Sequence, residues 1–208
     1  MSDFVACDLH LSPITTDEEL AVIRAFQNML GPRDRAIYAG DIKEFTWFTR
    51  AEVEACDAYK EWKSRLRSWD IELYGNHDVV EKDKLQETFL LRNIIVMHGH
   101  QFDKLAGGCA QRTYYRWAPW ARHVWLKSPL EQKMSHDTSW NAHNGQVWGT
   151  AINWLEASKY RTLVIGHTHD TAIINRPFSG RKFVAVGGLP EDRVYLNLDT
   201  MRVVKVTV

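Results

Sequence analysis

The chain contains 208 residues, a length typical of one globular domain with room for a single insertion. Lysine and arginine total 26, as do aspartate and glutamate, so the formal net charge is zero; 45% of the residues are hydrophobic and 25% are charged. This balance excludes disordered, collagen-like and coiled-coil chains. It also argues against a protein that coats nucleic acid through a generally basic surface, although a local basic groove stays open.

The cysteines and the N-terminal segment bear on the cellular compartment in which the protein is expected. Cys7, Cys56 and Cys109 form no CxxC pair, which predicts reduced thiols and no disulfide framework. The N-terminal segment has no basic start followed by an apolar run of signal length, and no stretch approaches the roughly 18 apolar residues of a membrane span. We therefore expect a cytoplasmic protein without a transmembrane segment.

The first third of the chain alternates strand and helix patterns. An apolar run over 4–7 predicts a buried strand, and a capping box at residue 16 opens a helix that extends to residue 30. A second strand is expected over 36–39. A charged stretch over 49–69, with apolar residues three and four apart, predicts one amphipathic surface helix.

Further apolar runs predict strands over 71–74, 94–97 and 163–165. The alternation with helices favours an α/β architecture. Four consecutive runs in the last 40 residues are expected to form a second, largely antiparallel sheet. They cover residues 172–175, 183–186, 194–198 and 203–208.

The interval from about 103 to 160 differs, because it holds six of the nine tryptophans and no strand pattern. We interpret it as a helical cap inserted into a single domain of residues 1–208, with an amphipathic helix around 148–155. Its aromatic and basic residues could pack the cap onto the domain, bind substrate, or contact a membrane surface peripherally. The basic candidates for substrate binding are Arg112, Arg116 and Arg122.

Each of the five strands before residue 170 ends in side chains that bind metals. Loops at the carboxyl ends of sheet strands commonly build one site, so these residues are expected to converge. Oxygen and imidazole donors without thiolate suit Mn²⁺, Fe²⁺ or Zn²⁺, and eight candidates are too many for one ion. They are Asp8, His10, Asp41, Asn76, His77, His98, His167 and His169.

The eight candidate ligands imply two adjacent divalent ions, and such a pair favours a particular type of reaction. When about 3.5–4 Å apart, such ions hold a bridging water, lower its pKa and clamp the oxygens of a phosphate. The pattern therefore predicts a hydrolase in which a hydroxide that bridges the metals attacks phosphorus without a covalent enzyme intermediate.

Five ordered motifs, DxH at 8–10, GD at 40–41, GNHD at 75–78, HGH at 98–100 and GHTH at 166–169, resemble the calcineurin-like metallophosphoesterase family. The resemblance implies two packed mixed β-sheets flanked by helices, a four-layer αββα sandwich. It also implies two divalent ions, with Mn²⁺ preferred and Fe²⁺, Zn²⁺ or Ni²⁺ as alternatives. By this resemblance the first ion is bound by Asp8, His10 and His169, the second by Asn76, His98 and His167, and Asp41 bridges the two.

The same resemblance assigns two catalytic roles. His77 lies over the substrate phosphate, where it steadies developing charge or protonates the leaving oxygen, and Asp78 orients its ring. His100 is expected to support a metal ligand or contact substrate, and Glu44 is a comparable candidate.

The motifs at 8–11 and 40–44 are similar to those of a narrower subgroup, the hydrolases of UDP-2,3-diacylglucosamine. That subgroup typically has arginine at the position of His77 and aspartate at that of His100. The substrate ranked first is a diphosphate such as a UDP-linked lipid or sugar. General phosphodiesters or phosphomonoesters, nucleic acid and a non-catalytic metal-binding scaffold are the alternatives.

Overall fold

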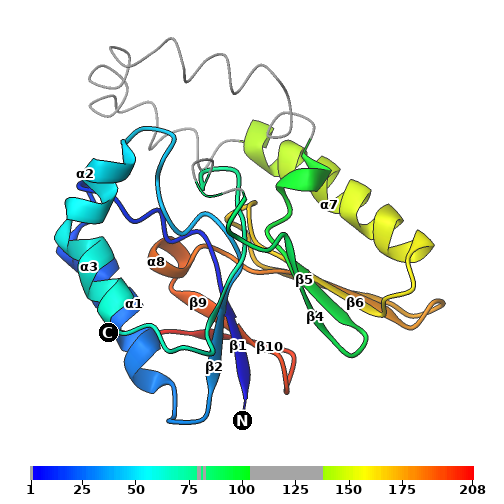
Figure 1. The fold of residues 1–208 in the computed structure, drawn as a ribbon. Helices are drawn as coiled ribbons and strands as arrows, with labels where there is room; N and C mark the ends of the chain where they lie inside the picture. Colours follow the sequence, from blue (N-terminus) through cyan, green and yellow to red (C-terminus); the bar gives the residue numbers. More distant parts are fainter. Residues whose placement is uncertain (1, 79–80, 82, 104–137) are drawn as a thin grey trace.

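The computed structural model describes residues 2–78, 81, 83–103 and 138–208, which form two mixed β-sheets between helices (Figure 1). The first sheet has the strand order β10-β9-β1-β2-β3, and the second has the order β4-β5-β6-β8-β7. The first comprises β1 (Asp3–Ala6), β2 (Arg35–Tyr38), β3 (Ile71–Glu72), β9 (Val194–Asn197) and β10 (Arg202–Lys205). The second comprises β4 (Thr88–Leu91), β5 (Ile94–Met97), β6 (Thr162–Ile165), β7 (Ala172–Arg176) and β8 (Arg181–Ala185).

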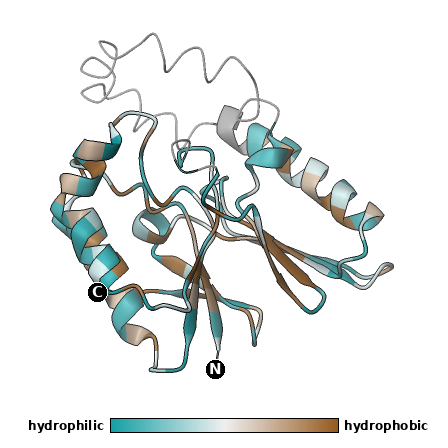
Figure 2. Cartoon of the chain, viewed as in Figure 1, coloured by the Kyte–Doolittle hydropathy of each residue, from teal (hydrophilic) through white to brown (hydrophobic). Residues whose placement is uncertain are grey.

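Helices cover the outer face of each sheet, so the described residues form the predicted four-layer α/β sandwich. One outer layer comprises α1 (Asp17–Met29), α2 (Arg50–Ala55), α3 (Asp57–Ser64) and the short α8 (Leu189–Asp192). The opposite layer is α7 (Thr138–Ala157), and a 3₁₀ turn, η2 (His100–Phe102), follows β5. Apolar residues concentrate on the strands between these layers (Figure 2).

Three apolar clusters fill the spaces between the layers. One joins the α1–α3 side to the first sheet and includes Phe26 and Trp62, both almost fully buried. The second lies between the sheets and includes Val5 of the first sheet and Val164 and Val184 of the second, all fully buried. The third joins α7 to the second sheet. Because burial of apolar surface is the main favourable contribution to folding, these clusters hold both sheets in a fixed relation.

The prediction of one continuous helix over 49–69 is wrong, because the structure has two short helices there, α2 and α3. A capping box of Thr49 and Glu52 starts α2. At Cys56 the backbone is extended (φ −74°, ψ 149°), which ends the first helix and begins the second. This turn lets both short helices bury their apolar residues, Val53 on α2 and Trp62 on α3.

The expectation that the last four strands form their own sheet is also wrong. Strands β7 and β8 form a hairpin on the second sheet, where β8 pairs in parallel with β6. After α8, β9 pairs with β1 and β10 with β9 in the first sheet. The apolar patterns identify these strands, but strand partners depend on tertiary packing. The strand β4, which pairs with β5, was not predicted.

Helix α7 confirms the amphipathic helix expected around 148–155, but it is part of the sandwich and not of a cap. Its residues Val147, Ala151 and Leu155 are buried against the second sheet. Residues 104–137 of the predicted cap, which include Arg112, Arg116 and Arg122, lie outside the described residues. Within the described part of the chain, every helix is too short or too polar to cross a membrane.

Candidate metal centre

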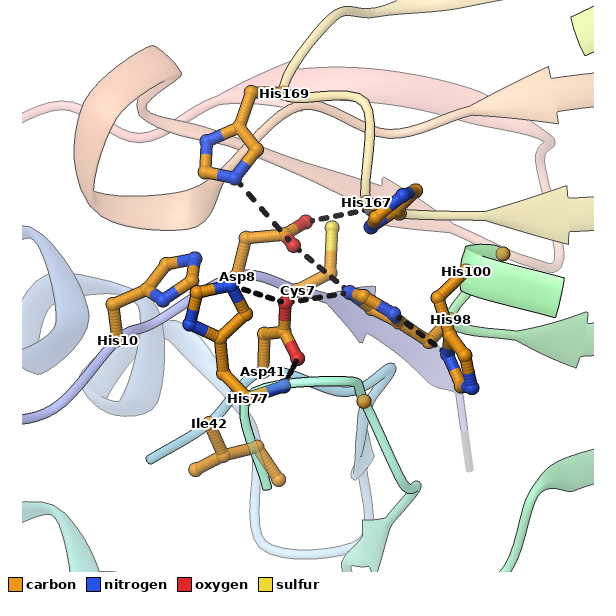
Figure 3. Close-up of polar contacts among 12 residues, drawn as sticks. Cys7, Asp8, His10, Asp41, Ile42, His77, His98, His100, His167 and His169 are labelled. Atoms are coloured by element: carbon orange, nitrogen blue, oxygen red, sulfur yellow. Dashed lines mark hydrogen bonds and ion pairs between the residues drawn. The ribbon is translucent and has the colours of Figure 1, made fainter. Parts of the chain in front are cut away.

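The metal-binding candidates all lie on loops that leave the carboxyl ends of strands. Asp8 and His10 follow β1, Asp41 follows β2, and the GNHD segment follows β3. His98 follows β5, and the segment 166–169 follows β6. Figure 3 shows that the labelled histidines of these loops, from both sheets, gather around the carboxylates of Asp8 and Asp41.

Backbone hydrogen bonds hold these loops together. The Asp8 amide donates to the Gly40 carbonyl at 3.1 Å, and the His10 amide donates to the Asp41 carbonyl at 2.9 Å. On the other sheet, the Gly166 amide donates to the His98 carbonyl at 2.9 Å. The loops therefore stay aligned with one another beyond the ends of the regular strands.

The backbone is left-handed at most of the candidate ligands. Their φ angles range from 46° at His10 to 68° at His167, a region that non-glycine residues rarely adopt. Such conformations persist when the surrounding structure enforces them, and they cluster at functional sites. The residues concerned are Asp8, His10, Asp41, His167 and His169.

Two glycines of the motifs allow the loops to approach closely. A Cβ atom at Gly75 would lie 2.1 Å from both the backbone nitrogen and Oδ1 of Asp41. At Gly166 it would lie 2.7 Å from the Cβ of Cys7 and 2.8 Å from Oδ2 of Asp8. Glycine is therefore needed at both positions, because any side chain would displace a carboxylate of the centre.

The candidate ligands form two adjacent clusters of potential donor atoms. Within each cluster the donor atoms lie within 4.8 Å of one another. The clusters are Asp8, His10 and His169, and Asp41, His98 and His167, with a third, overlapping group of His10, Asp41 and His77. The first cluster holds the three residues that the resemblance assigns to one ion, and the second holds His98 and His167 of the other set together with Asp41.

Two buried atoms in the centre indicate that a ligand is needed. Four side-chain atoms of the described residues are buried without a hydrogen-bond partner, and two of them, Nε2 of His10 and Oδ1 of Asn76, belong to the centre. The other two are Nε1 of Trp62 and Oδ1 of Asn144. An unsatisfied buried polar atom costs about 1–3 kcal/mol, so such atoms are rare without a reason. The two atoms of the centre belong to predicted metal ligands, one from each set, and a divalent cation would satisfy them.

Each candidate histidine ligand is held through the ring nitrogen away from the cluster. His10 Nδ1 lies 2.9 Å from a Glu44 oxygen, and His169 Nδ1 lies 2.6 Å from Oε2 of Glu191. His98 Nδ1 lies 3.2 Å from Nδ1 of His100. This is the arrangement of metal-binding histidines, in which an outer partner fixes the tautomer and leaves the other nitrogen for the metal.

The fourth of these histidines, His167, has its Nε2 3.0 Å from Oδ2 of Asp103. Neither Asp103 nor Glu191 belongs to a motif, and each becomes a partner only through the fold, so neither is predicted from the sequence. Glu44, a candidate from the sequence, is brought to the site as expected.

The electrostatics of the centre favour a cation. Asp8 and Asp41 are almost completely buried, and a buried charge requires a partner. Although burial opposes protonation of His98, the two carboxylates outweigh it and raise the pKa of this histidine to about 10. Burial likewise opposes protonation of His169, but Asp8 raises its pKa to about 9. Without a metal these imidazoles carry the compensating protons, which a divalent cation would replace.

The structure corrects the role expected for Asp78. Its carboxylate accepts hydrogen bonds from the backbone amides of Gly75 and Lys43, both at 3.0 Å, and so shapes two loops of the centre. The His77 ring instead lies 2.8 Å from Glu44, through Nδ1. The His77 amide donates to Oδ1 of Asp41 at 2.7 Å. Glu44 therefore orients the ring that Asp78 was expected to orient.

The chain was compared with known proteins. Neither protein-family models nor curated proteins give a match. Among solved structures, a metallophosphoesterase from Sphaerobacter thermophilus aligns over 98% of this chain and 86% of its own, with 15% identity and a TM-score of 0.50.

Two further structures align less closely. A dimetal phosphatase from Danio rerio covers 95% of this chain and 92% of its own, with 10% identity and a TM-score of 0.48. Vacuolar Protein Sorting 29 from Cryptosporidium parvum covers 90% and 74%, with 15% identity and a TM-score of 0.48. The likeness to the Sphaerobacter thermophilus structure, at 15% identity, establishes architecture alone, so the chain has the fold seen in that metallophosphoesterase, as the sequence predicts.

Proposed function

We propose that the protein is a phosphohydrolase that depends on two divalent metal ions. The observation that carries this proposal is the convergence of two donor clusters on a metallophosphoesterase fold, with an unsatisfied buried nitrogen of His10 in one cluster and an unsatisfied buried oxygen on Asn76. The proposed ligands are Asp8, His10 and His169 for one ion, Asn76, His98 and His167 for the other, and Asp41 for both.

When bound, the two ions supply an activated water and neutralise the charge of a phosphate. Asp41 can serve both because its Oδ2 lies 3.2 Å from Nε2 of His98, in one cluster, and it belongs with His10 in another. Its other oxygen, Oδ1, accepts the His77 amide hydrogen and places that residue at the edge of the centre.

His77 is the proposed acid that donates a proton to the oxygen leaving phosphorus. Burial opposes protonation of this imidazole, but Glu44 and then Asp41 outweigh it and raise its pKa to about 10. Glu44 stays ionised because, although its burial favours the neutral acid, His77 and His10 lower its pKa to about 2. The pair therefore keeps a proton on His77 at neutral pH.

Replacing Glu44 with glutamine is expected to move the alkaline limit of activity to lower pH. A protonated acid is lost as pH rises through its pKa, and removing the carboxylate charge lowers the pKa of His77. The shift should be about 1–3 pH units, the usual effect of one adjacent opposite charge. A pH profile of kcat measures it.

The matched control is Glu61→Gln, which removes a carboxylate that pairs with Arg24 on the surface. Its pH profile should coincide with that of the wild type. If Glu44→Gln also leaves the alkaline limit in place, the proposed role of the Glu44–His77 pair is wrong.

For the substrate we propose a diphosphate with a large organic group, such as a nucleotide-linked lipid or sugar. The similarity of motifs 8–11 and 40–44 to the UDP-2,3-diacylglucosamine hydrolases supports it. In this proposal Arg112, Arg116 and Arg122 are the cationic residues that would contact the phosphates. Peripheral contact with a membrane surface would bring a lipid substrate to the centre.

The proposal is tested by assaying the purified protein against nucleotide sugars, diphosphate lipids, chromogenic phosphodiesters, phosphomonoesters and oligonucleotides. We expect hydrolysis with added Mn²⁺, loss of activity with a chelator, and recovery when Mn²⁺ is restored. Fe²⁺, Zn²⁺ and Ni²⁺ are compared in the same assay. A protein that binds two ions but hydrolyses nothing in this panel would be a metal-binding scaffold.

A further inference from the structure

A carboxylate outside the motifs connects helix α7 to a proposed ligand of the second ion. Oδ2 of Asp103 lies 3.0 Å from Nε2 of His167 and 2.9 Å from Nε2 of His143 on α7. Asp103 is buried, and the side chain of His143 is 23% exposed. One carboxylate oxygen thus lies between two imidazoles, of which one belongs to the metal centre and the other to the outer helical layer.

The same face of α7 also holds the loop that carries His167 and His169. The side-chain amide of buried Asn144 donates through Nδ2 to the Thr168 carbonyl at 3.0 Å and to Oδ2 of Asp170 at 2.7 Å. One helical turn later, Nε1 of Trp148 donates to Oγ1 of Thr168 at 3.1 Å. Residues four apart lie on one helix face, so Asn144 and Trp148 hold this loop from the same face of α7.

We propose that Asp103 is a positioning residue for the second ion, and that His143 holds it in place. Contact with Asp103 occupies Nε2 of His167 and leaves Nδ1 as the nitrogen available to a cation. A carboxylate in this position fixes the ring and increases its basicity, and loss of such a partner costs about 10–100-fold in metal affinity. This inference rests on the pair of ions proposed above.

The position of Asp103 in the chain gives this contact a further consequence. Asp103 and His143 lie on opposite sides of residues 104–137 in the sequence, yet their side chains are in contact. Any change that separates α7 from Asp103 should therefore weaken binding of the second ion before that of the first.

The test measures Mn²⁺ binding to the full chain by calorimetry and electron paramagnetic resonance, separately from activity. For Asp103→Ala we expect one ion to bind as in the wild type and the other about 10–100-fold more weakly. The signal of a coupled Mn²⁺ pair should disappear at two equivalents and return at higher Mn²⁺ concentration. Asp103→Glu, which restores a carboxylate, should recover part of the affinity.

The control is Glu156→Ala, which removes a carboxylate from the other end of α7, where it contacts Arg176; this variant should bind both ions normally. Equal weakening of both ions in folded Asp103→Ala, or no weakening, would overturn the inference. If that variant does not fold, His143→Gln decides by the same criterion, with a smaller loss at the second ion expected. Wild-type protein that binds two ions without hydrolysing any substrate would contradict the proposed function alone.

Discussion

Replacing Asp41 with asparagine is expected to abolish the paired metal centre and reduce phosphodiester hydrolysis by about 1,000-fold or more. The two ions together stabilise the transition state by several kcal/mol, and each 1.36 kcal/mol corresponds to about tenfold in rate. Asp41 is buried beside His98 and His77, where it belongs to two donor groups. Asparagine has nearly the shape of the Asp41 side chain and can still accept the hydrogen of the His77 backbone amide. The substitution removes the negative charge that the two ions would share.

The measurement combines the rate in saturating Mn²⁺ with the number of ions bound per chain. The matched control is Asp3→Asn, because Asp3 is also buried but pairs with Arg35 through two hydrogen bonds of 2.8 Å on β1. That variant should unfold at lower temperature and keep two ions and normal activity. An Asp41→Asn protein with wild-type activity would show that the shared carboxylate is not needed.

Replacing His77 with glutamine is expected to lower kcat by about 10²–10⁴-fold, the usual contribution of a general acid, without changing the number of ions bound. His77 lies beside Asp41 but is held by Glu44, so its ring can act on substrate instead of serving as a ligand. Stepwise Mn²⁺ titration and rate measurements on the same preparation separate these two roles.

Substrates with different leaving groups provide the control for His77. Loss of a proton donor should slow a substrate with a poor alkoxide leaving group far more than one with a nitrophenolate, which leaves without protonation. Equal slowing of both substrates, or loss of one ion in His77→Gln, would contradict the assignment of His77 as the acid.

The position of the site could be predicted because the direction of the strands determines where their carboxyl ends lie. Short apolar runs that end in Asp8, Asp41, His98 and His167 are central parallel strands, and parallel strands place their carboxyl ends at one edge. The packing of one sheet against the other then brings both sets of loops together. Local patterns alone were therefore enough to indicate which side chains would meet.

Other features depend on tertiary contacts and left no local signal. The break at Cys56 and the division of β7–β10 between two sheets both follow from packing. Glu44 takes the place beside His77 that was expected for Asp78, because backbone amides of two loops occupy the Asp78 carboxylate. Asp103 becomes a partner of His167 only when α7 and the second sheet are assembled.

The most direct test of the central claim is a crystal structure of the protein grown with excess Mn²⁺, with anomalous scattering used to locate the metal. We expect two fully occupied peaks, about 3.5–4 Å apart as in other two-metal sites, with the Asp41 carboxylate between them. A single peak, or manganese bound away from Asp8, Asp41 and the surrounding histidines, would contradict the proposed paired centre.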